Sequence, residues 1–99
     1  MFDFKRHGER IGRLCRKYGI ARFEIFGSAL RDDFGADSDV DCLINFTEDD
    51  GNYFERYFDF KDELEKLFGR KVDLVVEKAI RNPYFKQDVN ETKQVIYAA

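Results

Sequence analysis

The sequence predicts one small domain of the α/β (α+β) class. Two stretches repeat apolar residues at helical spacing, and three shorter stretches alternate apolar with polar residues, as strands with one buried face do. We expect helices at 8–18 and 53–68, and strands at 20–26, 39–46 and 71–77. A chain of 99 residues can enclose one hydrophobic core but not a second substrate-binding domain, so residues 1–99 are taken as a single domain.

The composition is typical of a compact, well-solvated domain. Hydrophobic residues make up 43% and charged residues 37%, there is one proline, and no low-complexity run interrupts the chain. The first residues lack the apolar segment of a secretory signal, and no run reaches the roughly 18 residues of a membrane span. We therefore expect a cytoplasmic protein with no membrane contact.

Charge is distributed unevenly along the chain. The net charge is −3, yet residues 1–22 hold seven Lys or Arg against two acidic residues. Polyanion binding across the whole surface, and with it direct nucleic-acid binding, is not expected. Four cations of the first helical segment fall on one face, and this basic stripe is either solvated surface or a docking face for an acidic partner or phosphates. The stripe consists of Arg6, Arg10, Arg13 and Lys17.

The first predicted helix ends at Gly19, a typical stop signal. Cys15 in this helix and Cys42 in a later strand both occupy apolar positions, so we expect buried thiols rather than a disulfide or a metal pair. His7 precedes the helix and is expected at the surface.

The first predicted strand stops abruptly at Gly27 and Ser28. Gly27 can adopt backbone angles closed to other residues, and Ser28 is a good N-cap for a short helix that runs through Arg31. A strand that runs into a helix N-terminus presents free N–H groups and a hydroxyl, which suits an anion such as a nucleotide phosphate. On its own, a Gly-Ser pair is a turn in most proteins.

Two carboxylates stand at the head of the second predicted strand. Asp39 and Asp41 flank Val40 and therefore point to the same side of the strand. At a rise of about 3.3 Å per residue they are roughly 6 to 7 Å apart and repel each other unless a cation lies between them. A divalent metal ion meets that need most simply.

A third carboxylate, Asp73, lies in the valine-rich strand predicted at 71–77. An unpaired carboxylate is costly in an apolar interior, so Asp73 is expected either at the rim of the sheet or beside a cation. The aromatic residues of the helix at 53–68 are expected in the core rather than as a base-stacking platform. Beyond a break at Asn82 and Pro83, residues 84–98 are expected to form a helix.

Three interpretations of the acidic stretch compete. It could be a solvated acidic loop, but that leaves Asp73 unexplained. It could be a calcium loop with Asp37, Asp39, Asp41 and Glu48 as ligands, but Cys42 stands where the sharp turn of such a loop needs glycine. It could be a phosphoryl-type transfer site in which metal ions bridge carboxylates and nucleotide phosphates, with Gly27 and Ser28 gripping the outer phosphates.

A family resemblance favours the third interpretation. The run Phe26-Gly27-Ser28, then Arg31, then Ser38-Asp39-Val40-Asp41 resembles the polymerase-beta-type nucleotidyltransferase superfamily, and the later Val72-Asp73-Leu74-Val75-Val76 extends the match. The small size resembles the minimal nucleotidyltransferases, the MntA-like antitoxins that are paired with HEPN-domain toxins. The resemblance spans about residues 8–77.

The resemblance implies a nucleotidyltransferase fold, a small mixed sheet of about three to four strands with helices packed mainly on one face. It implies transfer of AMP from ATP to a tyrosine hydroxyl of a HEPN-type toxin, which neutralises the toxin and releases pyrophosphate. It also implies two Mg²⁺ ions. By this resemblance the metal-binding and catalytic residues are Asp39, Asp41 and Asp73, and the nucleotide-binding residues are Gly27, Ser28, Arg31 and Ser38.

The chain departs from the family pattern just after Arg31, where Asp32-Asp33 replaces the usual small glycine-containing turn. Two other functions stay open: an antitoxin that acts by stoichiometric binding without catalysis, and transfer to a small-molecule hydroxyl. The small-molecule enzymes of the superfamily carry an additional helical domain that this chain lacks. A template-directed polymerase is disfavoured by the acidic balance of the chain.

Overall fold

The structure is a computed structural model that describes residues 3–30, 35, 38–47, 51–85, 87 and 93–99. Its helices are α1 (Gly8–Tyr18) and α2 (Tyr53–Phe68), and three short 3₁₀ turns are η1 (Lys5–His7), η2 (Gly27–Leu30) and η3 (Glu77–Ala79). Its strands are β1 (Ile20–Phe26), β2 (Val40–Phe46), β3 (Val72–Val76) and β4 (Gln94–Ala98). The two predicted helices and the first three predicted strands are therefore confirmed, with small shifts at their ends.

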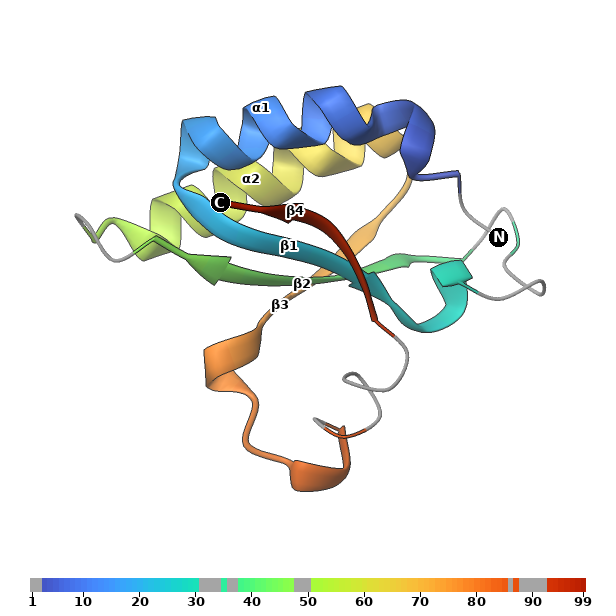
Figure 1. Cartoon of the computed structure of the whole chain (residues 1–99), viewed down its shortest axis with the longest axis vertical. Coiled ribbons are helices and arrows are strands. Elements are labelled where there is room, and N and C mark those ends of the chain that lie inside the picture. Colours follow the sequence, from blue (N-terminus) through green and yellow to red (C-terminus); the bar gives the residue numbers. More distant parts are fainter. Residues whose placement is uncertain (1–2, 31–34, 36–37, 48–50, 86, 88–92) are drawn as a thin grey trace.

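The strands form one mixed sheet in the order β3-β2-β1-β4. β1 is antiparallel to both β2 and β4, whereas β3 is parallel to β2 and reaches it through α2. Figure 1 shows α1 and α2 together on one side of the sheet, while η3 and residues 80–85 lie on the other side. The expected mixed sheet with helices mainly on one face is confirmed.

The main core lies between the two helices and the sheet. Ile11 and Cys15 of α1, Phe60 and Leu64 of α2, and Phe23 of β1 are all fully buried there. On the opposite face a smaller cluster joins buried Phe26 and Leu43 with partly buried Val75 and Ile80. The strands are thus covered on both faces at their centre, which explains why Leu43 is buried although it alternates with the core residues of β2.

The helix predicted at 84–98 is only partly correct, because residues 83–85 and 87 are helical but the end of the predicted range is a strand. Residues 94–98 form β4, which pairs with β1, and the N–H group of Ala99 donates to the carbonyl of Ala21 at 2.8 Å. Ile96 and Tyr97 pack against the main core. The run Val95-Ile96-Tyr97 has the β-branched and aromatic residues that strands favour, and the free edge of β1 supplies the partner that local spacing does not reveal.

Some expectations about single residues need correction. Phe60 is buried as predicted, but Tyr53, Phe54 and Phe58 of α2 are exposed, and Phe54 most of all at 76%. His7 lies outside both core clusters, as predicted, but it is only partly exposed and its ring lies 5.4 Å from that of Phe68. Burial, followed by the nearby Arg6 and Arg10, lowers the pKa of His7.

The cysteine prediction is confirmed, because Cys15 and Cys42 are both free and buried. Burial raises the pKa of Cys15 to about 12, so this thiol is inert near neutral pH. Among the described residues, no helix is both long enough and apolar enough to cross a membrane.

Two side chains of α2 reach the outer edge of β3. The Tyr57 hydroxyl donates to the carbonyl of Leu74, and the N–H group of Val72 donates to the Glu65 carboxylate at 3.0 Å. Lys71 and its alternate neighbours turn their backbone groups toward β2, so Val72 and Leu74 turn theirs outward. The helix that connects β2 to β3 therefore also satisfies part of the sheet edge that it creates.

Candidate functional site

The candidate site lies where three neighbouring strands bring Gly27, Asp41 and Asp73 together. Asp41 of β2 is the direct register partner of Asp73 of β3, and it is also the partner of Phe26 at the end of β1. Gly27 follows Phe26 immediately. Neighbouring strands lie about 4.8 Å apart and paired residues share a face, so the two carboxylates are adjacent on the face away from the helices. The sequence prediction that these residues converge is consistent with this pairing.

Gly27 brings the backbone close to the Asp41 carboxylate. Its φ of +72° belongs to the left-handed region, and a Cβ atom at this position would lie 2.5 Å from Oδ2 of Asp41. A side chain at residue 27 would therefore cause both backbone strain and a clash with the carboxylate. The expected helical turn is present as η2, but it already includes Gly27 and Ser28, so Ser28 is not its N-cap as predicted. The side chain of Ser28 and the whole of Arg31 lie outside the described residues.

Asp39 stands just before β2 and is exposed. Val40, between Asp39 and Asp41, is fully buried, so the alternation of an extended strand turns both aspartates away from the core. Ser38, expected to contact the nucleotide, has a structural contact here, because its hydroxyl accepts a hydrogen bond from the N–H group of Gly35 at 3.1 Å. The side chain of Arg70 also contacts Gly35 and Ser38, through their backbone carbonyls. The sequence did not single out Arg70.

Negative charge gathers on this part of the sheet. Burial is the largest cause that raises the pKa of the Cys42 thiol, and the charges of Asp41 and Asp73 are the next largest. Cys42 follows Asp41 in β2 and is fully buried. Burial also raises the pKa of Tyr57, and the Asp73 charge adds to that shift while Lys61 opposes it. Both carboxylates therefore add to the pKa shift of Cys42, and Asp73 also adds to that of Tyr57, although burial is the larger cause in each case.

The donor set suits a hard divalent cation. Within the described part of the chain, no three His, Cys, Asp or Glu side chains already converge as a metal-binding group. Mg²⁺ does not require such a cage, since it keeps several water ligands and is commonly held by one or two carboxylates together with substrate phosphates. The paired Asp41 and Asp73, with the glycine that leaves room beside Asp41, fit that mode of binding.

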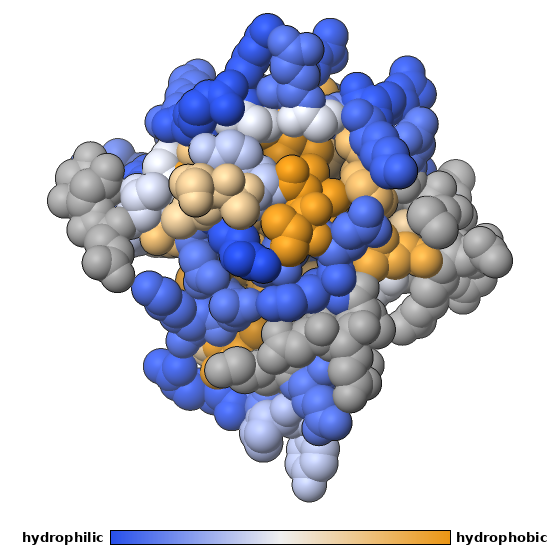
Figure 2. Space-filling view, viewed as in Figure 1, coloured by the Kyte–Doolittle hydropathy of each residue, from blue (hydrophilic) through white to orange (hydrophobic). Residues whose placement is uncertain are grey.

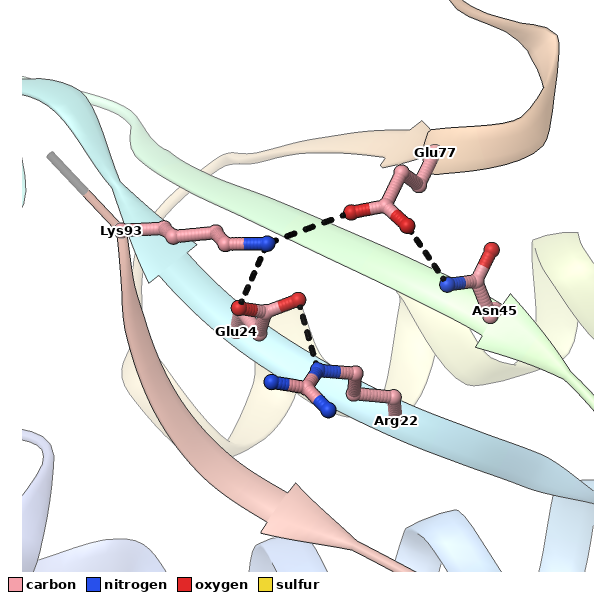
Figure 3. A network of polar contacts seen from close by, with 5 residues as sticks. All are labelled: Arg22, Glu24, Asn45, Glu77 and Lys93. Carbon is pink, nitrogen blue, oxygen red and sulfur yellow. Dashed lines mark hydrogen bonds and ion pairs between the residues drawn. The ribbon is translucent and has the colours of Figure 1, made fainter. Parts of the chain in front are cut away.

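A polar network occupies the same face farther along the strands (Figure 3). The buried carboxylate of Glu24 accepts a hydrogen bond from Nε of Arg22 at 3.0 Å and forms an ion pair with Nζ of Lys93 at 3.4 Å. Lys93 also lies 3.4 Å from Glu77, which accepts a hydrogen bond from Asn45 at 3.1 Å. The network joins β1, β2, η3 and the residue before β4. Its signal in the sequence was the pair of opposite charges that Arg22 and Glu24 place on one face of β1.

The four residues of the basic stripe are exposed, as both of its interpretations require. Figure 2 shows the α1 side of the molecule covered by hydrophilic residues. Arg10 and Arg13, with Lys66 of α2, line a groove of about 420 Å³ between the two helices. Arg13 is paired with Glu9 at 2.7 Å. Whether the stripe docks a partner stays a prediction.

Comparison with known proteins places these features in a family. The model of the nucleotidyltransferase domain family matches residues 9–96. A provisionally named protein adenylyltransferase of Methanocaldococcus jannaschii, MJ1379, is 37% identical over 75 residues, which cover 76% of this chain and 75% of the relative. The protein adenylyltransferase MntA of Thermococcus cleftensis is 30% identical over 82 residues, 83% of this chain and 81% of the relative.

Solved structures share the fold. A provisionally named minimal nucleotidyltransferase superposes with a TM-score of 0.77 at 31% identity, over 92% of this chain and 90% of the other. A toxin-antitoxin complex with AMP-PNP gives 0.71 at 18% identity, over 93% and 73%. A complex of the tri-AMPylated HEPN toxin of Shewanella oneidensis with its MNT antitoxin gives 0.66 at 16% identity, over 96% and 72%.

The fold and the paired carboxylates define the chain as a nucleotidyl-transfer domain by class. It belongs to the nucleotidyltransferase domain family, whose model spans most of its length. Its relatives include the protein adenylyltransferase MntA, and its structural neighbours include toxin-antitoxin complexes, so the resemblance drawn from the sequence motifs is confirmed.

Proposed function

We propose that this protein is an antitoxin that transfers AMP from ATP to a tyrosine hydroxyl of a HEPN-type toxin, which neutralises the toxin and releases pyrophosphate. The observation that carries the proposal is the direct pairing of Asp41 with Asp73, with Gly27 against the Asp41 carboxylate. Relatives named protein adenylyltransferases support the reaction. A structural neighbour that contains a tri-AMPylated HEPN toxin supports the partner, and one with AMP-PNP supports the nucleotide.

Asp39, Asp41 and Asp73 would hold Mg²⁺, with two ions expected. When bound, the ions neutralise negative charge on the nucleotide phosphates. Three hard carboxylate ligands on one face are the donor type that Mg²⁺ prefers. Gly27 leaves the space beside Asp41 open, and the family pattern assigns Gly27, Ser28, Arg31 and Ser38 to the nucleotide side of the site.

Bond changes in the proposed reaction are balanced. The acceptor oxygen forms a bond with the α-phosphorus of ATP, the bond from that phosphorus to the bridging oxygen breaks, and pyrophosphate leaves. The proton of the acceptor hydroxyl passes to a carboxylate oxygen of Asp73 and then to solvent. Asp73 is exposed, and it lies in the edge strand β3. Asp73 therefore has two roles in the proposal, as a metal ligand and as the proton acceptor.

The acceptor hydroxyl would come from the partner. Within the described part of the chain, the candidate site lies on one sheet with two helices on the opposite face, and these elements do not enclose an acceptor. A partner that brings its own hydroxyl supplies the missing surface. Since both ATP and HEPN-type toxins act inside the cell, we also place the reaction in the cytoplasm.

The test is to mix the protein with a HEPN-type protein from the same genome, ATP and Mg²⁺, and to measure the intact mass of the partner. We expect mass increments of one or more AMP units with the wild type, and none with Asp41→Asn or Asp73→Asn. Asp62→Asn is the matched control, because Asp62 is an exposed acid of α2 paired only with Lys66 in the contacts that the structure gives. An unmodified partner with the wild type would refute AMP transfer.

The same experiment separates the alternatives. If Asp41→Asn still neutralises the toxin fully, the protein acts by stoichiometric binding rather than by catalysis. If ATP is consumed with a small-molecule alcohol present but the partner's mass never changes, the acceptor is a small-molecule hydroxyl.

A further inference from the structure

We infer that Arg70 is a positioning residue that sets the place of Asp39 for metal binding. The inference rests on the proposed function, because it assigns Asp39 a metal ion. Arg70 lies in the turn between α2 and β3, far from Asp39 in the sequence. Its role is visible only in the fold.

One guanidinium nitrogen of Arg70 holds the turn that leads into Asp39. Nη1 donates to the carbonyl of Gly35 at 3.0 Å and to the carbonyl of Ser38 at 3.0 Å. The Ser38 carbonyl belongs to the peptide group that ends at the nitrogen of Asp39. A hydrogen bond to this oxygen therefore fixes the plane of the peptide from which Asp39 starts.

Lys71, which follows Arg70 in the turn between α2 and β3, binds the chain on the other side of Asp39. The N–H group of Val40 donates to the carbonyl of Lys71 at 3.0 Å. Asp39 is thus bracketed by two hydrogen bonds, one before it to Arg70 and one after it to Lys71. Because Asp39 lies outside the strand proper, these two bonds do for it what the strand ladder does for Asp41.

Glu65 of α2 in turn holds the segment that carries Arg70 and Lys71. The N–H group of Gly69 donates to the Glu65 carbonyl at 2.9 Å, and the N–H group of Val72 donates to the Glu65 carboxylate at 3.0 Å. Glu65 therefore fixes the turn just before Arg70 and just after Lys71. A short segment held at both ends can impose its geometry on the turn that it contacts.

A purely electrostatic role for Arg70 predicts the opposite result. A cation beside a metal-binding carboxylate such as Asp39 repels a divalent ion, so removal of its charge alone would tighten metal binding. Removal of a positioning contact would instead weaken metal binding, because Asp39 would have to be ordered by the ion itself. Partners that orient metal ligands through hydrogen bonds commonly change metal affinity by about tenfold to a hundredfold when they are removed. The sign of the change thus decides between the two roles.

The test measures Mn²⁺ binding to the nucleotide-free protein by the electron paramagnetic resonance signal of free Mn²⁺. We expect Arg70→Ala to bind Mn²⁺ about tenfold more weakly than the wild type. Lys66→Ala, which removes an exposed cation from the last turn of α2, should bind as the wild type does. Unchanged or tighter binding by Arg70→Ala would overturn the inference.

A second variant guards against a folding defect. Arg70→Lys keeps the charge and most of the stem, but its ammonium is on a shorter side chain and cannot reach both carbonyls. We expect binding several-fold weaker than that of the wild type, and binding equal to the wild type would show that the two hydrogen bonds of the guanidinium group are not required, which would overturn the inference. Asp41→Asn separates the two proposals. The proposed metal site fails if Asp41→Asn binds Mn²⁺ as tightly as the wild type, or if the wild type binds none. If Asp41→Asn loses Mn²⁺ binding but the Arg70 variants bind as the wild type does, only the role of Arg70 is refuted.

Discussion

At the scale of single residues, the site depends on the smallest side chain in it. Gly27 permits a backbone conformation with φ of +72° at the point where the chain passes the Asp41 carboxylate. Both conditions exclude other residues, one through backbone strain and the other through the 2.5 Å approach of Oδ2. The site therefore requires a residue without a side chain at position 27.

We predict that Gly27→Ala reduces AMP transfer to the partner at least tenfold, which corresponds to about 1.4 kcal/mol of transition-state stabilisation. The added methyl group must displace the Asp41 carboxylate or the turn at η2. The measurement is the initial rate of AMP incorporation at saturating ATP. Gly8→Ala is the control, since a Cβ atom there meets nothing within 4 Å, and it should keep wild-type activity. Wild-type activity in Gly27→Ala would mean that the approach to Asp41 is not required.

At the scale of elements, α2 both connects and supports the parallel pair. Tyr57 and Glu65, two turns apart on this helix, bind backbone groups of β3. The strand that carries Asp73 is thereby fixed from two directions, by β2 on one side and by α2 on the other. A helix that only covered the core would not constrain the register of an edge strand in this way.

Tyr57→Phe is predicted to lower the free energy of unfolding by about 1 kcal/mol, because the carbonyl of Leu74 loses its donor in a partly buried place. Tyr84→Phe makes the same chemical change at a side chain that is 83% exposed, and it should leave stability within about 0.5 kcal/mol of the wild type. Urea unfolding followed by circular dichroism measures both. Equal stabilities for the two variants would contradict a role for the Tyr57 hydroxyl.

At the scale of the whole molecule, one ion-pair network ties the beginning of the fold to its last strand. Lys93 links Glu24 of β1 with Glu77 of η3, just before β4 joins the sheet. Glu24 is 1% exposed, so its charge depends on Arg22 and Lys93 for compensation. Removal of one partner from a buried pair costs more than the pair itself contributes, since a charge stays behind in the interior.

Lys93→Met is predicted to destabilise the protein by about 3 kcal/mol near pH 7, as measured by urea unfolding. The double variant with Glu24→Met should recover part of this loss, because no buried charge is then left unpaired. A loss below about 0.5 kcal/mol, or no recovery in the double variant, would contradict the network's role.

The same comparison has a pH dependence. The hydrogen bond from Asn45 and the charge of Lys93 outweigh burial and lower the pKa of Glu77 from its ordinary value of 4.5. A carboxyl group with a lowered pKa contributes stability above its unfolded pKa and loses it as the pH falls through its folded pKa. The difference between wild type and Lys93→Met should therefore shrink as the pH falls below about 4.5.

Local patterns predicted more of this fold than long-range ones. The helices and the strands β1, β2 and β3 follow from spacing within each segment, and the alternation around Val40 correctly placed Asp39 and Asp41 away from the core. β4 was missed because a strand at a sheet edge depends on a partner distant in the sequence. Arg70 was missed for a related reason, since it binds backbone carbonyls, and any residue supplies a carbonyl.

The contacts of Tyr57 and Glu65 also limit how a partner can approach Asp73. A segment that joined the sheet beside β3 would compete for the N–H group of Val72 and the carbonyl of Leu74, which side chains of α2 already bind. In the proposed reaction, we therefore expect the acceptor side chain to come from a folded surface or a loop of the partner, rather than from a strand added to the sheet. A partner presented in this way keeps its own fold while one hydroxyl enters the site.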